Sequence, residues 1–568
     1  MAELNRFLEA FARKELDLRA FVRANRSALW KISYFVIAIF LFVSATWKRF
    51  SLPQDPLADL DFGYLGPALM RLSGGALAHI QGLNFLYPAM VYLILRTCLD
   101  FRAISVIQHL LGLIAGGLFL ATWSRLADFF PKPRLNRVAH ETIGLFGAGT
   151  YLLSNGPIFF EMQIRSDAVC MFFEILVFWL IVQFFYYRAI STNACKMIVY
   201  GIAVAVSAFI LASLKPSFTL MALFAVAPVI WFVVNAKGNL AGRVTFFAIS
   251  VPIIVALTLI EHNLRRNDQT VKMFLPETLF VTHAKIIRAQ MAADLENGET
   301  DIYSPEWLRV ACNDLESEIQ RTHNLYPRVF PILGFQPDYL KFGADSLLDR
   351  WRGQLGKERF LRFLKYWYWR SVAHRPFDFI NKVAGQLGVF YSMNCPAFSA
   401  RKAWPLSSWS YAGSLSALSR PQSFQLVSKT PAGSAFLRRT QALRVSDIIV
   451  HQNKGVQICH VCFARTYLAI LLISVPLAGW FMFKRRSSER SKWPEFFVII
   501  FYSANFGNVF GISVVHTMEV WRYSTVLFIT ALFAQLWAIR WLIEIVLINL
   551  REVESRATVR YSQHEVPR

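Results

Sequence analysis

The chain has 568 residues, of which 55% are hydrophobic and only 17% are charged. This balance excludes an ordinary soluble protein, because too few polar side chains remain to cover its surface. The net charge of +23 does not indicate nucleic acid binding, since the basic residues gather in short loops beside apolar segments and no groove-reading motif accompanies them. The composition predicts an integral membrane protein with no nucleic acid partner.

Residues 1–29 precede the first apolar segment. Within them, Leu4, Phe7, Leu8 and Phe11 fall at helical spacing among arginines and lysines, which predicts a cytoplasmic, basic amphipathic helix on the membrane surface. The apolar segment that follows is too long and too far from the N-terminus for a cleaved signal, so we expect it to be retained as an anchor.

About ten apolar segments are long enough to cross the hydrocarbon core as helices. They predict an all-α integral membrane fold: a polytopic helical bundle of about ten spans, in which residues 30–260 form one module and residues 466–548 form the C-terminal spans. The expected spans are residues 30–47, 103–123, 139–155, 168–187, 197–214, 218–234, 244–260, 466–483, 496–515 and 524–548.

One further apolar segment decides the topology. Residues 85–95 (FLYPAMVYLIL) have about half the length that a spanning helix needs, so we interpret them as a helix lying at the membrane interface. The basic loops, including residues 484–492 (KRRSSERSK), then fall on the cytoplasmic side, as the positive-inside rule requires. Both termini, including the tail 549–568, are predicted to be cytoplasmic. A first outer loop, residues 48–102, is predicted to carry membrane-lying helices on the other face.

The second large extracytoplasmic element is a soluble insert, residues 261–465. Its pattern predicts helices over residues 276–291, 305–322 and 357–373, whereas residues 394–431 are rich in Ser, Pro and Gly and are expected to form an irregular loop. Aromatic residues 366–369 suit either the membrane interface or a sugar ring, and we favour the interface. The insert's role, in binding an acceptor or a partner, stays open.

Three polar clusters sit at the predicted outer edge of the spans. Acidic side chains there are costly to bury and must be solvated, paired or functional. An arginine beside acids is either an ion pair or a ligand for a lipid phosphate, because guanidinium binds phosphate oxygens in pairs. The clusters are Asp55, Asp59 and Asp61 in the first outer loop, Glu161, Arg165 and Asp167 between two spans, and His516, Glu519, Arg522 and Tyr523 along one helix face; Lys215 ends another span nearby.

With these residues in place, the chain resembles the GT-C class of membrane glycosyltransferases, which includes the protein O-mannosyltransferases and the lipid A aminoarabinose transferases. The resemblance rests on the acidic first outer loop, on FLYPAMVYLIL as a counterpart of the PPLY-type stretch, on the RSD turn at residues 165–167 and on KPS at residues 215–217. It covers roughly the first 260 residues. It implies a polyprenyl-phosphate-linked sugar as donor, inverting displacement, and a glycan, lipid or protein acceptor on the extracytoplasmic face.

The resemblance also implies roles for the residues. Asp61 or Asp59 becomes the general base, and Arg165, Lys215, His516 and Arg522 become ligands of the donor phosphate, supported by Asp55, Glu161, Asp167, Glu519 and Tyr523. The Asp-Glu dyad of the mannosyltransferases is absent, and Asp59-Leu60-Asp61 stands instead. This departure leaves the base open between two residues. No cofactor or protein metal site is expected, although spaced acids leave room for a divalent cation.

Two other functions stay open on the sequence alone. A transporter or flippase of a polar or lipid-linked substrate predicts ionisable residues in the middle of the spans, and Glu174 is the main example here. A ligase or polymerase of lipid-linked glycans would use a similar donor on the same face. The apolar, Arg-rich composition favours a multi-pass protein of the bacterial inner membrane, surrounded by membrane lipids.

Overall fold

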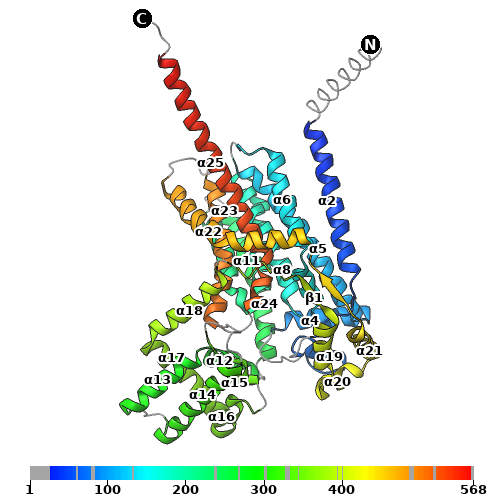
Figure 1. The fold of residues 1–568 in the computed structure, drawn as a ribbon, viewed down its shortest axis with the longest axis vertical. Helices are drawn as coiled ribbons and strands as arrows, with labels where there is room; N and C mark the ends of the chain where they lie inside the picture. Colours follow the sequence, from blue (N-terminus) through cyan, green and yellow to red (C-terminus); the bar gives the residue numbers. More distant parts are fainter. Residues whose placement is uncertain are drawn as a thin grey trace, which may run out of the picture.

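The computed structural model describes the chain from Arg26 to His564 with short gaps. Outside the described residues lie 1–25, 59–61, 78–83, 131–132, 236–239, 266–268, 300–302, 326–332, 343–344, 393, 400, 485–491, 516–519 and 565–568. The predicted amphipathic helix and most of the KRRSSERSK segment therefore fall outside them. Within the described ranges the protein is a helical bundle with two mostly helical lobes at one end (Figure 1).

Nine helices among the described residues are long and apolar enough to cross a membrane. They coincide with nine of the predicted spans and confirm a polytopic, all-α membrane protein. The remaining predicted span, residues 139–155, is also helical, but α6 (Arg137–Leu152) has only 16 residues. The long helices are α2 (Arg26–Phe50), α5 (Arg102–Leu126) with η1 (Ala127–Phe129), α8 (Asp167–Ala189), α9 (Ala194–Leu214), η2 (Pro216–Phe218) with α10 (Thr219–Val234), α11 (Leu240–Arg265), α22 (Lys454–Lys484), α23 (Trp493–Val515) and α25 (Phe528–His564).

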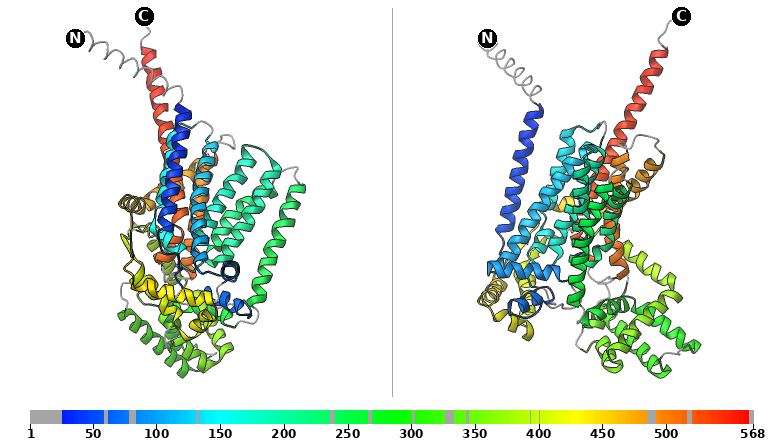
Figure 2. Two further views of the ribbon diagram at one scale, coloured as in Figure 1. Left: turned by 90° about the vertical axis from the view of Figure 1, so that its right-hand side faces the viewer. Right: turned by 180° about the vertical axis from the view of Figure 1, so that it is seen from behind.

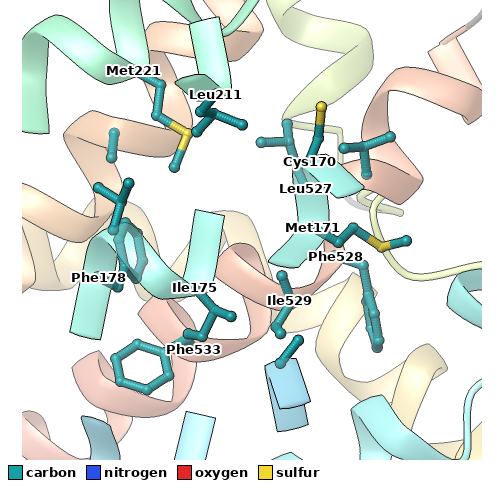
Figure 3. Packing of buried hydrophobic residues seen from close by; sticks show 14 of the residues in the cluster. Cys170, Met171, Ile175, Phe178, Leu211, Met221, Leu527, Phe528, Ile529 and Phe533 are labelled. Carbon is teal, nitrogen blue, oxygen red and sulfur yellow. The ribbon is translucent and has the colours of Figure 1, made fainter. Parts of the chain in front are cut away.

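Helix α8 lies at the centre of the bundle. Its apolar window is 78% buried, whereas those of α2 and α11 are only 6% and 11% buried. A helix that is hydrophobic all round packs among other helices, and peripheral helices leave their apolar side chains to face lipid. Figure 3 shows Cys170, Met171, Ile175 and Phe178 of α8 packed with residues of α9, α10 and α25.

The first loop, residues 48–102, lies across one end of the bundle. Its helices are α3 (Leu65–Leu72) and α4 (Leu86–Cys98), and α4 has 13 residues, too few to cross the hydrocarbon core. Figure 2 shows α4 lying crosswise at the lower end of the neighbouring long helices. We call this the insert side of the bundle, because residues 269–453 lie there too. Helix α2 begins and α25 ends at the opposite end (Figure 1).

The insert forms two separate lobes. The first has a hydrophobic core of its own, which includes Phe280, Trp351 and Trp367. Lys382 joins it to the bundle by donating to the carbonyl of Ser513 in α23, at 2.8 Å. The helices of this lobe are α12 (Gln269–Thr282), α13 (Ala284–Asn297), α14 (Pro305–Leu325), α15 (Asp338–Phe342), α16 (Leu347–Leu355), α17 (Lys357–His374) and α18 (Pro376–Phe390).

The second lobe, residues 403–451, corrects a sequence expectation. The composition of residues 394–431 predicts an irregular loop, but much of this stretch is helical. Pro421 opens α20 and Pro431 opens α21, because proline suits the first helical position, where no backbone donor is needed. The lobe contains the antiparallel pair β1 (Ala403–Pro405) and β2 (Ile449–His451), the π-helix η3 (Leu406–Tyr411), α19 (Ala412–Leu418), α20 (Pro421–Ser428) and α21 (Pro431–Val445).

The contact between α10 and α23 depends on a glycine. A Cβ atom on Gly507 would stand 2.9 Å from the backbone carbonyl carbon of Leu220, and backbone cannot move aside as a side chain can. We expect Gly507→Ala to cost about 1–3 kcal/mol through overpacking. Gly479→Ala in α22 is the matched control, because no atom lies within 4 Å of its Cβ position. Thermal unfolding in detergent measures both, and equal midpoints would contradict the close α10–α23 contact.

Candidate functional site

A buried carboxylate marks the insert-side end of α8. Asp167 is the first residue of α8, where the helix dipole favours negative charge, and Lys215 is the residue at which α9 ends, where the dipole favours a cation. Because α8 and α9 run antiparallel and pack along their lengths, these two ends meet. Lys215 Nζ lies 2.7 Å from Asp167 Oδ1, and both side chains are buried. Pro216 fixes the turn that places Lys215.

Helix α24 (Val520–Val526) adds a second cation to Asp167. The Arg522 guanidinium lies 3.3 Å from Asp167 Oδ2 and 3.4 Å from Oδ1. The Tyr523 ring covers the Lys215 ammonium, with 4.2 Å from Nζ to the ring centroid, which is a cation–π contact. Arg165, two residues before α8, adds its positive field at Asp167. We call Asp167, Lys215, Arg522, Tyr523 and Arg165 the Asp167 centre.

The described part of the Asp167 centre is rich in cations. Three cationic side chains, Arg165, Lys215 and Arg522, act on the Asp167 carboxylate. Burial lowers the pKa of Lys215, and the adjacent Asp167 opposes that shift. A cation-rich, partly buried cluster at the end of a helical bundle suits an anion, and guanidinium and ammonium groups together suit a phosphate. The centre brings together Arg165, Asp167, Lys215, Arg522 and Tyr523 from separate regions of the sequence.

Glu161 lies elsewhere, although only a few residues separate it from Asp167. Its carboxylate accepts from Arg49 at 2.8 and 2.9 Å, and His109 Nδ1 lies 2.8 Å away. The reason is local: Glu161 ends a separate helix, α7 (Asn155–Glu161), and Gln163 then forms a parallel bridge with Leu57 before α8 begins. Gly112 makes room for it, because a Cβ there would stand 2.0 Å from Glu161 Oε1. Glu161 thus belongs to a helix junction rather than to the Asp167 centre.

Asp55 is likewise held by an ion pair. Arg439 of α21 donates from Nε to Asp55 Oδ1 at 2.6 Å, and from a terminal nitrogen to Asp100 at 3.1 Å. Burial raises the pKa of Asp55, and Arg439 offsets part of that shift. The carboxylate of Asp55 thus binds the insert, and its predicted support of a catalytic cluster stays a prediction.

Four predicted site residues lie outside the described residues: Asp59, Asp61, His516 and Glu519. The residues next to the first pair are described. Ala58 and Phe62 are both buried, and the Tyr64 hydroxyl accepts from Ser166 Oγ at 3.4 Å. Because Ser166 precedes Asp167, this contact links the first loop to the Asp167 centre. The roles of the four residues stay predictions.

Sequence reasoning missed Arg49, His109 and Arg439. Each pairs with an acid that is 52 to 384 positions away in the sequence, so no local pattern marks the partner. Arg49 offered one signal, since an arginine at the end of an apolar span must find a counter-charge or reach water. In the part of the chain that the structure describes, no group of three or more His, Cys, Asp or Glu side chains is placed to hold a metal ion.

Removing Arg49 tests the helix junction. Arg49→Met leaves the fully buried Glu161 without its main counter-charge, and breaking such a pair costs about 3–5 kcal/mol. We expect a large fall in the thermal unfolding midpoint of the purified protein. The control is Arg137→Met, which breaks the Arg137–Glu141 pair where Arg137 is 70% exposed; exposed pairs contribute little. Equal midpoints for the two variants would show that Glu161 is satisfied without Arg49.

Comparison with known proteins gives no relative for this chain. No protein-family model matches it, and no curated protein and no solved structure matches it either. The function is therefore argued from the residues and their geometry.

Proposed function

We propose that the protein is an integral-membrane glycosyltransferase that moves a sugar from a polyprenyl-phosphate donor to a glycan, lipid or protein acceptor on the extracytoplasmic face. The observation that supports it most is the Asp167 centre. A lipid phosphate has its charge at the membrane edge and its tail in the hydrocarbon, and a cluster of cationic side chains at the ends of spanning helices matches that arrangement.

The two closest cations have different roles in this proposal. Lys215 is 7% exposed and contacts Asp167 at 2.7 Å, whereas Arg522 is 15% exposed and contacts it at 3.3 Å. The shorter and more buried pair fixes the end of α9. The longer contact with Asp167 and the greater exposure make Arg522 the better placed of these two cations to bind a phosphate. The Tyr523 ring lies against both cations, with its centroid 4.2 Å from Lys215 Nζ and 5.7 Å from the Arg522 guanidinium carbon.

The chemistry needs a base and charge neutralisation. In the proposed step, Asp59 or Asp61 removes the proton from the acceptor hydroxyl as its oxygen attacks the anomeric carbon. The bond from that carbon to the phosphate oxygen breaks, and the electron pair leaves with the polyprenyl phosphate, so the anomeric configuration inverts. Cations near the leaving phosphate stabilise its developing charge. The Tyr64–Ser166 contact, which joins the first loop to the Asp167 centre, supports this pairing of base and cations.

One observation favours the alternative of a transporter or flippase. Glu174 is fully buried in α8, about two turns from Asp167, and its Oε2 accepts from Thr530 at 2.8 Å. Ionisable residues inside spans mark pathways in transporters. Movement of a lipid-linked sugar across vesicles that contain only the purified protein, without a covalent product, would support that function instead. A ligase or polymerase of lipid-linked glycans would differ from the proposed enzyme in its product, which would carry a whole added glycan and not a single added sugar.

Single replacements test the base. We expect one of Asp59→Asn and Asp61→Asn to lower sugar transfer in membranes by about 10²–10⁴-fold, the typical contribution of general base catalysis, and the other to have a smaller effect. Asp128→Asn is the control, because Asp128 pairs with Arg125 on the opposite side of the bundle and is 41% exposed. Full activity in both test variants would remove the proposed base.

A second replacement tests the phosphate ligand. We expect Arg522→Gln to raise the KM for the donor and to lower kcat, together by about 10–100-fold in kcat/KM, equivalent to one or two charge-assisted contacts. Arg522→Lys should recover part of the loss, because an ammonium keeps the charge but not the paired donors. The KM for the acceptor should change little. A loss confined to the acceptor KM would contradict this assignment.

A further inference from the structure

The second lobe of the insert holds both ends of the first loop. Arg439 contacts Asp55, near the start of that loop, and Asp100, near its end. One turn earlier on α21, Phe436 stacks on Phe101, with ring centroids 4.5 Å apart and planes at 6°. The face of α21 that carries Phe436 and Arg439 therefore meets the consecutive residues Asp100 and Phe101.

Two further hydrogen bonds fix the beginning of the loop. The Tyr411 hydroxyl donates to the backbone carbonyl of Asp55 at 2.8 Å, and Ser414 Oγ accepts from the backbone N–H of Ala58 at 2.9 Å. Both side chains come from the π-helix and α19 of the same lobe. Ala58 is the last described residue before Asp59, so the lobe fixes the backbone up to the predicted base.

From these contacts we infer that Arg439 is a positioning residue, which clamps the first loop to the second lobe and thereby holds residues 55–58, the stretch that leads to the predicted bases. The effect of the clamp on activity rests on the proposed function. The attachment of the first loop to the second lobe does not depend on that function. The second lobe then serves to position the first loop, which is separate from any role of the first lobe in binding an acceptor.

Arg439 is needed to hold the two ends of the first loop together because it neutralises two neighbouring carboxylates. Asp55 is buried and faces Asp100, so without Arg439 the two carboxylates repel each other. Asp100 keeps a second partner, Arg102, at 2.7 Å, whereas Asp55 has no second side-chain cation within ion-pair distance among the described residues. The loop ends should therefore separate most in Arg439→Gln, less in Asp55→Asn and least in Asp100→Asn.

Hydrogen exchange of the full-length protein in lipid nanodiscs tests the clamp. We expect Arg439→Gln to raise exchange in peptides covering residues 52–58 and 62–77 by about tenfold or more, while peptides from α13 and α14 in the first lobe stay unchanged. Arg438→Gln is the matched control, because Arg438 is the exposed neighbour on the same helix. If Arg439 acts through Asp55 and Asp100, adding both Asn replacements to Arg439→Gln removes the repulsion between the two acids and lowers the exchange below that of Arg439→Gln alone.

Sugar transfer supplies the second readout. We expect Arg439→Gln to lower kcat about tenfold or more, with the donor KM within about threefold of the original, because the loop and not the phosphate site is displaced. Arg439→Lys should recover part of kcat, since one ammonium reaches one of the two acids. Unchanged exchange in the first loop, or a rise that spreads equally to α13 and α14, would overturn the clamp. Absence of sugar transfer in the original protein would overturn the proposed function and leave the exchange result to decide the clamp.

Discussion

The ion pair between Arg49 and Glu161 is the constraint on which the insert side of the bundle depends. Helix α2 leaves most of its apolar side chains facing outward, so apolar packing alone holds it loosely. Its last turn is fixed because Arg49 donates to both oxygens of Glu161 and also to the carbonyl of Leu152. A buried pair is retained only when its donors and acceptors are satisfied, and here they are shared among α2, α5, α6 and α7.

Once the end of α2 is fixed, the first loop begins at a defined point. Leu57 then pairs by backbone hydrogen bonds with the carbonyl of Met162 at 2.7 Å and the N–H of Ile164 at 2.9 Å. Gln108 of α5 donates to the carbonyls of Glu161 and Gln163, and so holds the same turn from the other side. The segment that leads into Asp167 is thus positioned by the first loop, which explains how distant acidic and basic clusters reach one end of the bundle.

The spans and the short α4 helix were predictable because hydropathy and length act locally. The pairing of Asp167 with Lys215 was partly predictable, since an acid opening one span and a lysine ending the next lie on the same side of the membrane. The pairs Arg49–Glu161 and Arg439–Asp55 were not predictable. Their members are 112 and 384 residues apart, and the sequence alone does not show which acid pairs with a given arginine. The helices of the second lobe were not predictable from a composition rich in Ser, Pro and Gly, because prolines such as Pro421 and Pro431 suit both loops and helix starts.

The distribution of buried polar groups bears on the choice between a catalytic rim and a transport path. At the end opposite the insert, Glu544 accepts from Arg540 at 2.6 Å and from the backbone of Arg134 and Leu135. At the insert side lie Glu161, Asp167 and Asp55. Between them the core of α8 is apolar except for Glu174 and Gln183. Helix α8 thus offers a transported polar solute only two polar side chains between its ends, whereas the proposed lipid-linked donor needs only its head group at the edge and leaves its tail in the hydrocarbon.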